Sequence, residues 1–192
     1  MWLLAGLGNP GERYAGNRHN VGFMAADAIS ARYEFSSYLK KFGGLFTDGR
    51  IANQRLLLLK PMTFMNRSGL PVAEALGFYR LPPERLIVVH DELDLPLGGV
   101  RVKKGGGAGG HNGIKDIDRI VGPDYFRVRV GIGHPGDKNL VTDYVLSDFR
   151  PEEVRAINAV LSAIAQHLPF LLTQEAAAFS NAVKTTAAAG LG

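Results

Sequence analysis

Apolar residues occur along this chain in two patterns, and each pattern predicts one kind of element. Short apolar or alternating runs predict strands, and apolar residues spaced three and four apart predict helices. The predicted strands are residues 2–5, 45–47, 54–59, 86–89, 98–103 and 126–131. The predicted helices are 21–33, 65–79, 114–121, 151–168 and a last one that ends near residue 184. This alternation of strands and helices predicts an α/β protein, a single-domain three-layer α/β/α sandwich.

Turn and breaker residues refine this picture. Asp48-Gly49-Arg50 lies between two strand-like runs and predicts a hairpin, which makes the central sheet mixed but mostly parallel. The continuous run from Leu56 to Leu59 predicts a strand that is buried on both faces. Pro169 is expected to break the long C-terminal helix. Residues 185–192 are expected to form a flexible tail, so that one domain spans residues 1–184.

Composition narrows the class of protein. The chain has 192 residues, of which 46% are hydrophobic and 21% charged, as in an ordinary globular domain. No apolar run approaches the ~20 residues of a membrane helix, and the first residues lack the basic start of a signal peptide. There is no cysteine, which excludes disulfides, thiolate metal ligands and a cysteine nucleophile. We therefore expect a cytoplasmic protein with no membrane association.

Positive charge is concentrated in one segment. The net charge is +4, and residues 97–140 hold eight cations against four carboxylates, while the rest of the chain is balanced. Within this segment, Arg101 and Lys103 alternate with valines in one predicted strand, and Arg127 and Arg129 do so in another. Each of these two strands therefore directs its cations to one face. Rows of cations on a sheet suit a phosphate backbone. The alternative is an ordinary solvated strand face.

Two glycine-rich stretches resemble phosphate-binding loops but lack their essential partners. Gly6-Leu7-Gly8-Asn9-Pro10-Gly11 fits G-x-G-x-x-G, yet the next helix begins about ten residues too late to carry a pyrophosphate on its N-terminus. The stretch from Gly105 to Gly113 is not followed by the Gly-Lys-Ser/Thr of a nucleoside triphosphate site. Neither stretch therefore predicts a nucleotide cofactor, and the second could be a flexible surface turn.

Polar residues follow several predicted strands, at the edge where α/β proteins bind ligands. They are Asn9, His19, Asn66, Asp91, His111 and Asn112. A histidine beside an aspartate suggests a base whose tautomer a carboxylate fixes, and asparagine amides can donate to an oxyanion or to a substrate amide. The set favours direct hydrolysis by activated water. A metal site built from His19, His111 and Asp91 remains the alternative, and each residue taken singly could be structural.

Four ordered motifs then make the chain resemble the bacterial peptidyl-tRNA hydrolases. They are Gly6 to Tyr14 with Arg18-His19-Asn20-Val21-Gly22, then Lys60 to Gly69, then His90-Asp91-Glu92-Leu93-Asp94, and finally Gly109-Gly110-His111-Asn112-Gly113. The match continues through Arg129 to Pro135 and reaches about Phe149. Two departures stand out: Asn17 where a threonine is common, and the glycine-rich Gly105-Gly106-Gly107.

This resemblance implies an enzyme that cleaves the ester between a peptide and the 3′-terminal ribose of tRNA, recycling tRNA from prematurely dropped peptidyl-tRNA. It implies that His19 activates water, and that Asp91 holds His19 in its basic form. It also implies that Asn9 and Asn66 contact the peptide main chain. Asn112, supported by His111, would place the water and the substrate.

The resemblance further implies contacts with the tRNA itself. Tyr14 and Phe64 would line the site near the acceptor end, and Lys103 and Arg129 would clamp a phosphate. The family uses no metal or other cofactor, is usually monomeric and needs no stable protein partner. Two other functions remain open, a non-catalytic RNA-binding module and a metal-dependent hydrolase of another ester.

Overall fold

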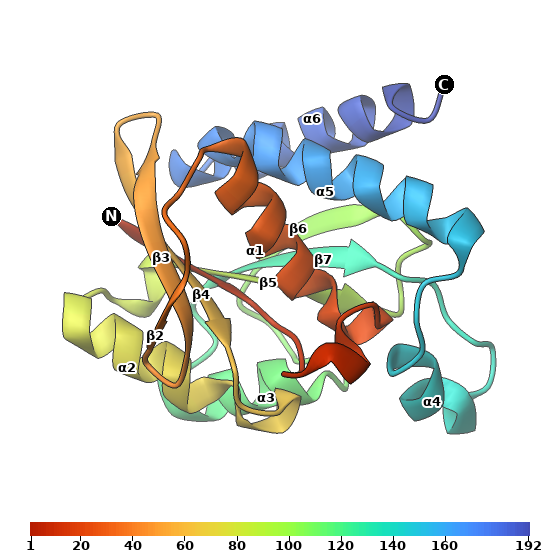
Figure 1. Cartoon of the computed structure of the whole chain (residues 1–192), viewed down its shortest axis with the longest axis horizontal. Coiled ribbons are helices and arrows are strands. Elements are labelled where there is room, and N and C mark those ends of the chain that lie inside the picture. The colour runs from red at the N-terminus through yellow and green to blue at the C-terminus, as the bar shows by residue number, and fades with distance from the viewer.

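The computed structural model describes residues 1–192 and has one seven-stranded sheet with helices on both faces (Figure 1). The strand order is β2-β3-β4-β1-β5-β7-β6. The strands are β1 (Trp2–Gly6), β2 (Leu39–Lys41), β3 (Gly44–Ile51), β4 (Gln54–Pro61), β5 (Leu86–Glu92), β6 (Val100–Lys104) and β7 (Phe126–Gly131). The four central strands β4, β1, β5 and β7 are parallel, whereas β3 and β6 are antiparallel to their neighbours. The predicted mixed α/β sandwich is confirmed.

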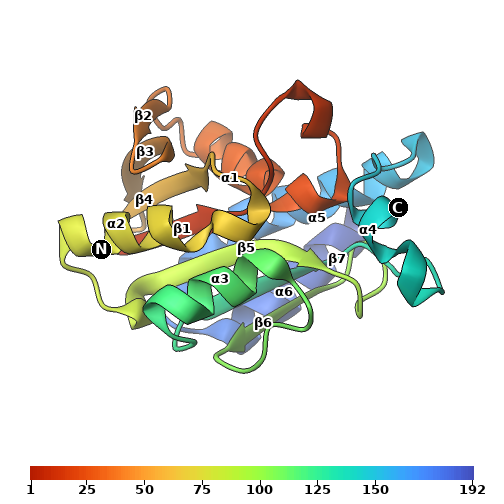
Figure 2. The same ribbon diagram turned by 90° about the horizontal axis from the view of Figure 1, so that it is seen from below.

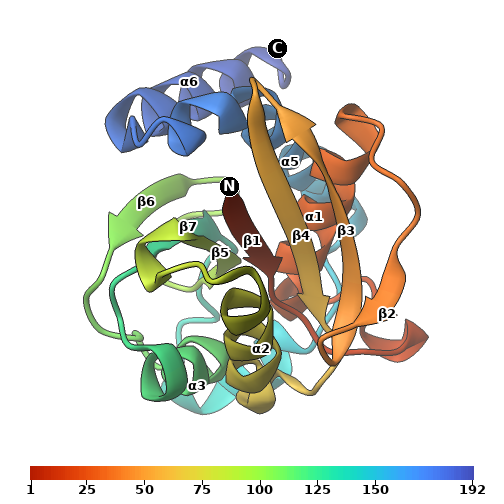
Figure 3. The ribbon, with the colours of Figure 1, turned by 90° about the vertical axis from the view of Figure 1, so that its left-hand side faces the viewer.

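Helices form a layer on each face of the sheet. They are α1 (Val21–Arg32), α2 (Gly69–Tyr79), α3 (Asn112–Val121), α4 (Val141–Val145), α5 (Pro151–Leu172) and α6 (Ala176–Ala189). Figure 3 views the sheet from one end, with α1, α5 and α6 on one side and α2 and α3 on the other. In Figure 2, α2 and α3 lie side by side on the same face of the sheet, and α4 stands beyond the strand ends. Two separate apolar clusters fill the spaces between the layers.

Strand β4 is buried on both faces, as its leucine run predicts. Leu56 and Leu58 belong to the cluster under α1 and α5, and Leu57 and Leu59 belong to the cluster under α2. All four side chains are fully buried. The parallel strands on both sides of β1 therefore form a rigid floor, and their carboxyl ends meet at one edge of the sheet.

The glycines of the first motif allow α1 to approach this floor very closely. A Cβ on Gly22 would lie 2.3 Å from the Val89 carbonyl oxygen, and a Cβ on Gly6 would lie 2.1 Å from the Gly22 carbonyl oxygen. The ring of Phe23 occupies the place of a Cβ on Gly8, at 2.7 Å. Gly6 and Gly8 therefore serve helix–sheet packing. The junction that carries His19 is fixed against the sheet as a result.

The predicted position of the hairpin turn is wrong. Strand β3 continues through Asp48-Gly49, and the turn lies at Ala52-Asn53, where both residues adopt positive φ angles of 47° and 64°. Gly49 stays in the strand because the Phe35 ring packs where its Cβ would be, 2.4 Å away. Asp48 stays there with an ion pair to Arg55 of β4, at 2.9 Å. Long-range packing thus overrides the local turn preference of Asp-Gly.

The prediction that Pro169 breaks the long helix is also wrong, since α5 continues to Leu172. Proline supplies no N–H for the carbonyl four residues earlier, which would otherwise lack a partner. Here the Tyr33 hydroxyl donates a hydrogen bond of 2.7 Å to the Ala165 carbonyl and replaces the missing donor. The last helix, α6, extends to Ala189, beyond its predicted end near residue 184.

Two further elements were not predicted, and one helix has an unexpected character. Strand β2 and helix α4 are only 3 and 5 residues long, too short to leave a periodic pattern.

Helix α5 is long and apolar enough to cross a membrane by length and composition, although no single apolar run indicated this. Buried core helices meet the same criterion, and α5 contributes Ile157, Ile164 and Leu168 to the main apolar cluster.

Candidate active site

A cavity of about 600 Å³ opens at the carboxyl edge of the parallel strands. It collects residues from the loop after β1, the turn before α1, the turn before α2, the end of β5, the glycine loop before α3, and α4. Of the residues predicted from the sequence, the lining includes Asn9, His19, Phe64, Asn66, Asp91, His111 and Asn112. Residues separated by about a hundred positions in the chain therefore meet at this edge of the sheet, as the parallel topology leads one to expect.

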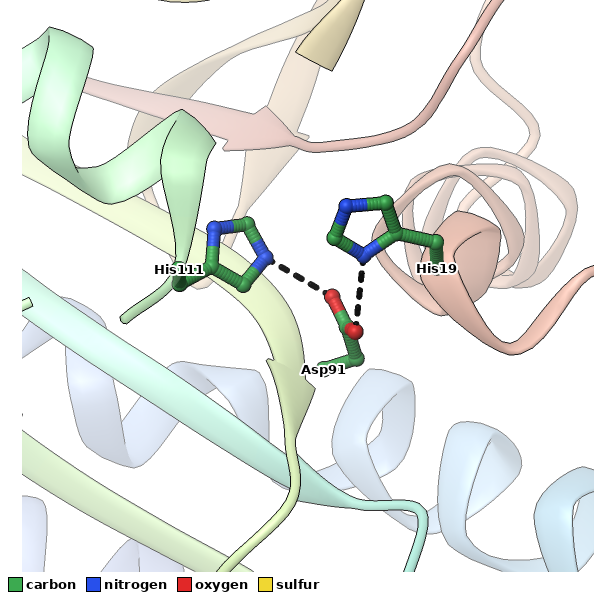
Figure 4. A group of neighbouring side chains, drawn as sticks. All are labelled: His19, Asp91 and His111. Carbon is green, nitrogen blue, oxygen red and sulfur yellow. Dashed lines mark hydrogen bonds and ion pairs between the residues drawn. The ribbon is translucent and has the colours of Figure 1, made fainter. Parts of the chain in front are cut away.

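Asp91 belongs to the lining of this cavity and joins two histidines (Figure 4). Its Oδ2 lies 2.8 Å from His19 Nδ1, and its Oδ1 lies 2.8 Å from His111 Nε2. The carboxylate side chain is only 3% exposed, and those of His19 and His111 are 12% and 8% exposed. One buried carboxylate thus fixes the orientation of both imidazole rings.

The hydrogen bonds of this group assign the tautomers. Burial by itself would raise the pKa of Asp91, but the two imidazoles beside it hold that pKa well below its usual range, so Asp91 accepts both bonds. His111 Nδ1 accepts from the backbone N–H groups of Gly113 and Ile114, which places its hydrogen on Nε2. His19 donates from Nδ1, and its Nε2 makes no hydrogen bond within the protein. That nitrogen keeps a free lone pair, as a general base requires.

Asn9 presents amide hydrogens to the cavity. Its Oδ1 accepts from the Met65 N–H at 2.7 Å, which identifies that atom as the oxygen and leaves the two hydrogens on Nδ2 free. The backbone of Asn9 is held from both sides by the Asn20 side chain, at 2.9 Å each. Asn20 was missed as a site residue, although it lies in the Arg18-His19-Asn20 motif, directly after the histidine.

Arg18 is a second residue that the sequence reading did not single out. Its side chain is buried, with an ion pair of 2.6 Å to Glu153 of α5 and hydrogen bonds to the backbone oxygens of Ser147 and Asp148. Asn17, the departure from the usual threonine, donates to Asp148 at 2.7 Å. These contacts connect the turn that carries His19 to the segment that follows α4, the helix whose Val141, Thr142 and Val145 line the cavity.

The remaining predicted residues lie around the cavity. Asn66 and Asn112 are exposed residues of its lining. Phe64 is 56% exposed at the rim, and its ring meets that of Tyr14 edge-on, 6.5 Å between centroids. Tyr14 therefore stands beside the cavity without lining it.

A smaller cavity of about 290 Å³ adjoins the first and contains the predicted phosphate clamp. Lys103 and Arg129 both line it, on antiparallel neighbours β6 and β7. Arg129 pairs with Glu92 at 2.8 Å, which directs its guanidinium across the sheet. The prediction that Arg127 also points to solvent is wrong, because its side chain is 2% exposed and pairs with Asp118. The two arginines share a strand face, but α3 and the glycine loop cover only Arg127.

His90 lines the smaller cavity and is in a different state from the other two histidines. Its Nδ1 donates to the Asp91 carbonyl oxygen at 2.8 Å, and its Nε2 is buried without a partner. Burial, reinforced by the nearby His111, lowers the pKa of His90 to about 3. His90 is therefore neutral near pH 7 and supports the ring of His111, whose centroid is 4.9 Å away.

The same three residues also satisfy the spacing of a metal site. One ligand atom each from His19, Asp91 and His111 lies within 4.8 Å of the others. His19, Asp91 and His111 would hold such an ion, and an imidazole nitrogen that bound it would give up its hydrogen and its hydrogen bond to Asp91. The donor set fits a two-histidine, one-carboxylate centre, so the metal alternative needs a direct test.

The fold and this cavity together fit an α/β enzyme that works by general-base chemistry, with a basic cavity next to the reacting centre for an anionic part of its substrate. Comparisons with known proteins identify the family within this class. The model of the family described as peptidyl-tRNA hydrolase matches residues 3–189, and this chain belongs to that family.

Individual relatives align with nearly the whole length of this chain. A peptidyl-tRNA hydrolase of Chelativorans sp. is 55% identical over 94% of this chain and 76% of its own length. That of Azorhizobium caulinodans is 54% identical over 94% of this chain and 89% of its own. The crystal structure of a peptidyl-tRNA hydrolase from Acinetobacter baumannii superposes with a TM-score of 0.90 at 38% identity, covering 95% of this chain and 94% of that one. The resemblance read from the four motifs is confirmed.

Proposed function

We propose that this chain hydrolyses the ester between a peptide and the 3′-terminal ribose of tRNA, with His19 as the general base. The observation that carries the mechanism is the pair formed by His19 and Asp91. Their 2.8 Å hydrogen bond holds the ring with its hydrogen on Nδ1 and leaves Nε2 free at the cavity. An imidazole held in this tautomer can take a proton from water.

In this mechanism the oxygen of a water molecule attacks the ester carbonyl carbon, and its proton moves to His19 Nε2. Asp91 stabilises the resulting imidazolium. The Nδ2 hydrogens of Asn9 are oriented to meet the developing oxyanion or the neighbouring peptide carbonyl. When the tetrahedral intermediate collapses, the ribose 3′-oxygen leaves and takes the proton from His19. The products are tRNA with a free 3′-hydroxyl and a peptide carboxylic acid, which releases its proton to solvent and becomes a carboxylate.

The asparagines and the basic cavity account for the choice of substrate. The exposed amides of Asn66 and Asn112 suit the amide groups of a peptide main chain, which a free aminoacyl-tRNA lacks. Tyr14 and Phe64 offer aromatic faces to the unpaired acceptor end, and Lys103 with Arg129 offers charge to a phosphate. We propose a monomer that acts in the cytoplasm, where translation supplies peptidyl-tRNA.

The first prediction concerns His19. His19→Ala is expected to lower the turnover of an N-acetylaminoacyl-tRNA by about 10²–10⁴-fold, the usual contribution of a general base, while binding of tRNA is retained. Release of the labelled amino acid under single-turnover conditions measures the first effect, and a filter-binding titration measures the second. Near-normal turnover in this variant would rule out His19 as the base.

The same assay separates the metal alternative. Wild-type protein is dialysed against a chelator and assayed with and without added divalent cations. Unchanged turnover is expected for a water activated by histidine alone. Loss of turnover that a divalent ion restores would instead support the His19, Asp91 and His111 metal centre. Free aminoacyl-tRNA serves as the substrate control, and it is expected to react far more slowly than the N-blocked form.

A further inference from the structure

We propose that Arg127 is a positioning residue, which holds the glycine loop and α3 as one unit and thereby places His111 and Asn112. The inference rests on the proposed function, because its readout is peptidyl-tRNA hydrolysis. It assigns Arg127 a different role from that of Arg129, although both lie on the same face of β7 and line the same small cavity.

The contacts of Arg127 reach three elements. Its Nη1 donates to the Gly107 carbonyl oxygen at 2.8 Å, and its Nη2 donates to Asp118 Oδ1 of α3 at 3.0 Å. The guanidinium also lies over the Tyr125 ring, 4.7 Å from the centroid. The Tyr125 hydroxyl donates to the same Asp118 oxygen at 2.7 Å. One buried cation therefore ties β7, the glycine loop and α3 together.

The glycine loop has few other constraints. Gly105, Gly106, Gly109 and Gly110 all have positive φ angles, so the loop is built from residues that restrict the backbone least. Its backbone hydrogen bonds join Gly105 to Tyr125 and His111 to Ala108, at its two ends. The Lys103 side chain packs against Gly106, and the bond from Arg127 to Gly107 is the side-chain hydrogen bond that holds the middle of the loop.

This loop leads directly to the reacting centre. His111 follows it, caps α3 through Nδ1 and donates to Asp91 from Nε2. Asn112 is the first residue of α3 and lines the catalytic cavity. A shift of the loop or of α3 therefore moves His111 relative to Asp91 and moves the Asn112 amide relative to the substrate. Misplacement of about 1 Å can cost as much as 10²-fold in rate.

Arg127 is poorly placed to bind phosphate itself. Its side chain is 2% exposed, whereas that of Arg129 is 23% exposed and Lys103 is exposed. Two of its three nitrogens already donate to protein acceptors. Its Nε–H is buried without a partner and each Nη carries a second N–H, so it is the burial of the side chain, rather than a lack of free donors, that keeps a phosphate away from Arg127.

The test compares Arg127→Lys with Arg129→Lys and Arg129→Ala, and uses Arg155→Lys on the exposed side of α5 as a matched control. Arg127→Lys keeps the charge, but a lysine cannot reach both acceptors with a planar fork. For Arg127→Lys, kcat at saturating N-acetylaminoacyl-tRNA is expected to fall by about 10- to 100-fold. The salt dependence of tRNA binding is expected to stay unchanged, whereas Arg129→Ala is expected to flatten it by about one phosphate contact.

A second variant keeps the test valid if Arg127→Lys does not fold, as thermal unfolding would reveal. Tyr125→Phe removes only the hydroxyl that supports Asp118 and is expected to lower kcat a few-fold, again without changing the salt dependence. An unchanged kcat in every variant that folds would overturn the inference. So would a loss of tRNA affinity with a flatter salt dependence in Tyr125→Phe or Arg127→Lys. Failure of the wild-type protein to release the amino acid would refute the proposed function instead.

Discussion

Three histidines surround Asp91, and at the scale of single residues their hydrogen bonds give each a different chemical state. His19 keeps a free Nε2, His111 uses both ring nitrogens, and His90 donates to the Asp91 carbonyl while its Nε2 stays buried and unpartnered. The same residue type thus supplies the proposed base, a support for the carboxylate and a neutral packing element. Geometry around each ring decides which role it takes.

The buried state of His90 predicts a specific dependence of stability on pH. Its pKa is about 3 in the folded protein and about 6.5 in an unfolded chain, so between these values the unfolded state binds one more proton. Stability from this group is therefore complete above about pH 6.5 and is lost as the pH falls, at up to about 1.4 kcal/mol per pH unit. His90→Asn removes the titrating group and is expected to give a correspondingly shallower loss. Urea unfolding between pH 4 and 7 measures both proteins, and parallel curves would contradict the prediction.

At the scale of elements, the site is assembled at junctions where a loop becomes a helix. His19 lies in the turn before α1, Asn66 in the turn before α2, and His111 caps α3. Each helix is packed against the sheet or against its neighbour, so each junction is held at a fixed height above the strand ends. The precision of the catalytic groups therefore depends on helix packing far from the substrate.

A substitution at Gly22 tests whether the position of the His19 turn depends on the packing of α1. Gly22→Ala would place a methyl group 2.3 Å from the Leu7 nitrogen and from the Val89 carbonyl oxygen, which are backbone atoms that cannot rotate away. We expect a destabilisation of about 1–3 kcal/mol, the usual cost of overpacking, together with reduced turnover because the His19 turn is displaced. Gly77→Ala in α2, where a Cβ meets nothing within 4 Å, is the matched control and should preserve turnover. Normal stability in Gly22→Ala would show that α1 can move without cost.

The β3–β4 hairpin gives a prediction of the opposite sign. Ala52 has a φ angle of 47°, a conformation that costs a residue with a side chain about 1–2 kcal/mol and costs glycine little. Ala52→Gly is therefore expected to stabilise the protein by several tenths of a kcal/mol, after the greater flexibility of glycine in the unfolded chain is subtracted. Chemical denaturation measures the change, and turnover should be unaffected because the turn lies at the other end of the strands. A destabilised variant would indicate that the turn relaxes differently.

At the scale of the whole molecule, the charged segment and the catalytic edge form one continuous surface. The basic cavity and the catalytic cavity share Asp94 and Gly109 in their linings. The cations of the basic cavity come from β6 and β7, the strands that carry most of the excess positive charge of residues 97–140. A large anionic substrate could therefore contact the basic cavity while its ester lies beside His19.

This arrangement predicts how tRNA binding responds to salt. Lys103→Ala and Arg129→Ala are each expected to weaken binding and to reduce the slope of log affinity against log salt by about one, and the double variant by about two. Turnover at saturating substrate should change much less than affinity, since neither residue lines the cavity that contains His19. Binding titrations between 50 and 300 mM salt, roughly the range in which the slope is linear, provide the measurement. Unchanged slopes in both single variants would remove the clamp from the mechanism.

The sequence by itself determined the layer architecture, the buried β4 strand and the set of polar residues at the strand ends, because these follow from local periodicity and from the direction of parallel strands. It misplaced the hairpin turn and ended α5 too early, because the ring of Phe35 and the hydroxyl of Tyr33 act from elsewhere in the chain. Only the tertiary structure distinguished the buried Arg127 from the partly exposed Arg129, and the buried His90 from the cavity-lining His19. Burial and hydrogen-bond partners set the chemical state of a side chain. The sequence shows which polar residue follows each strand. The roles of these residues depend on contacts between positions up to about a hundred residues apart.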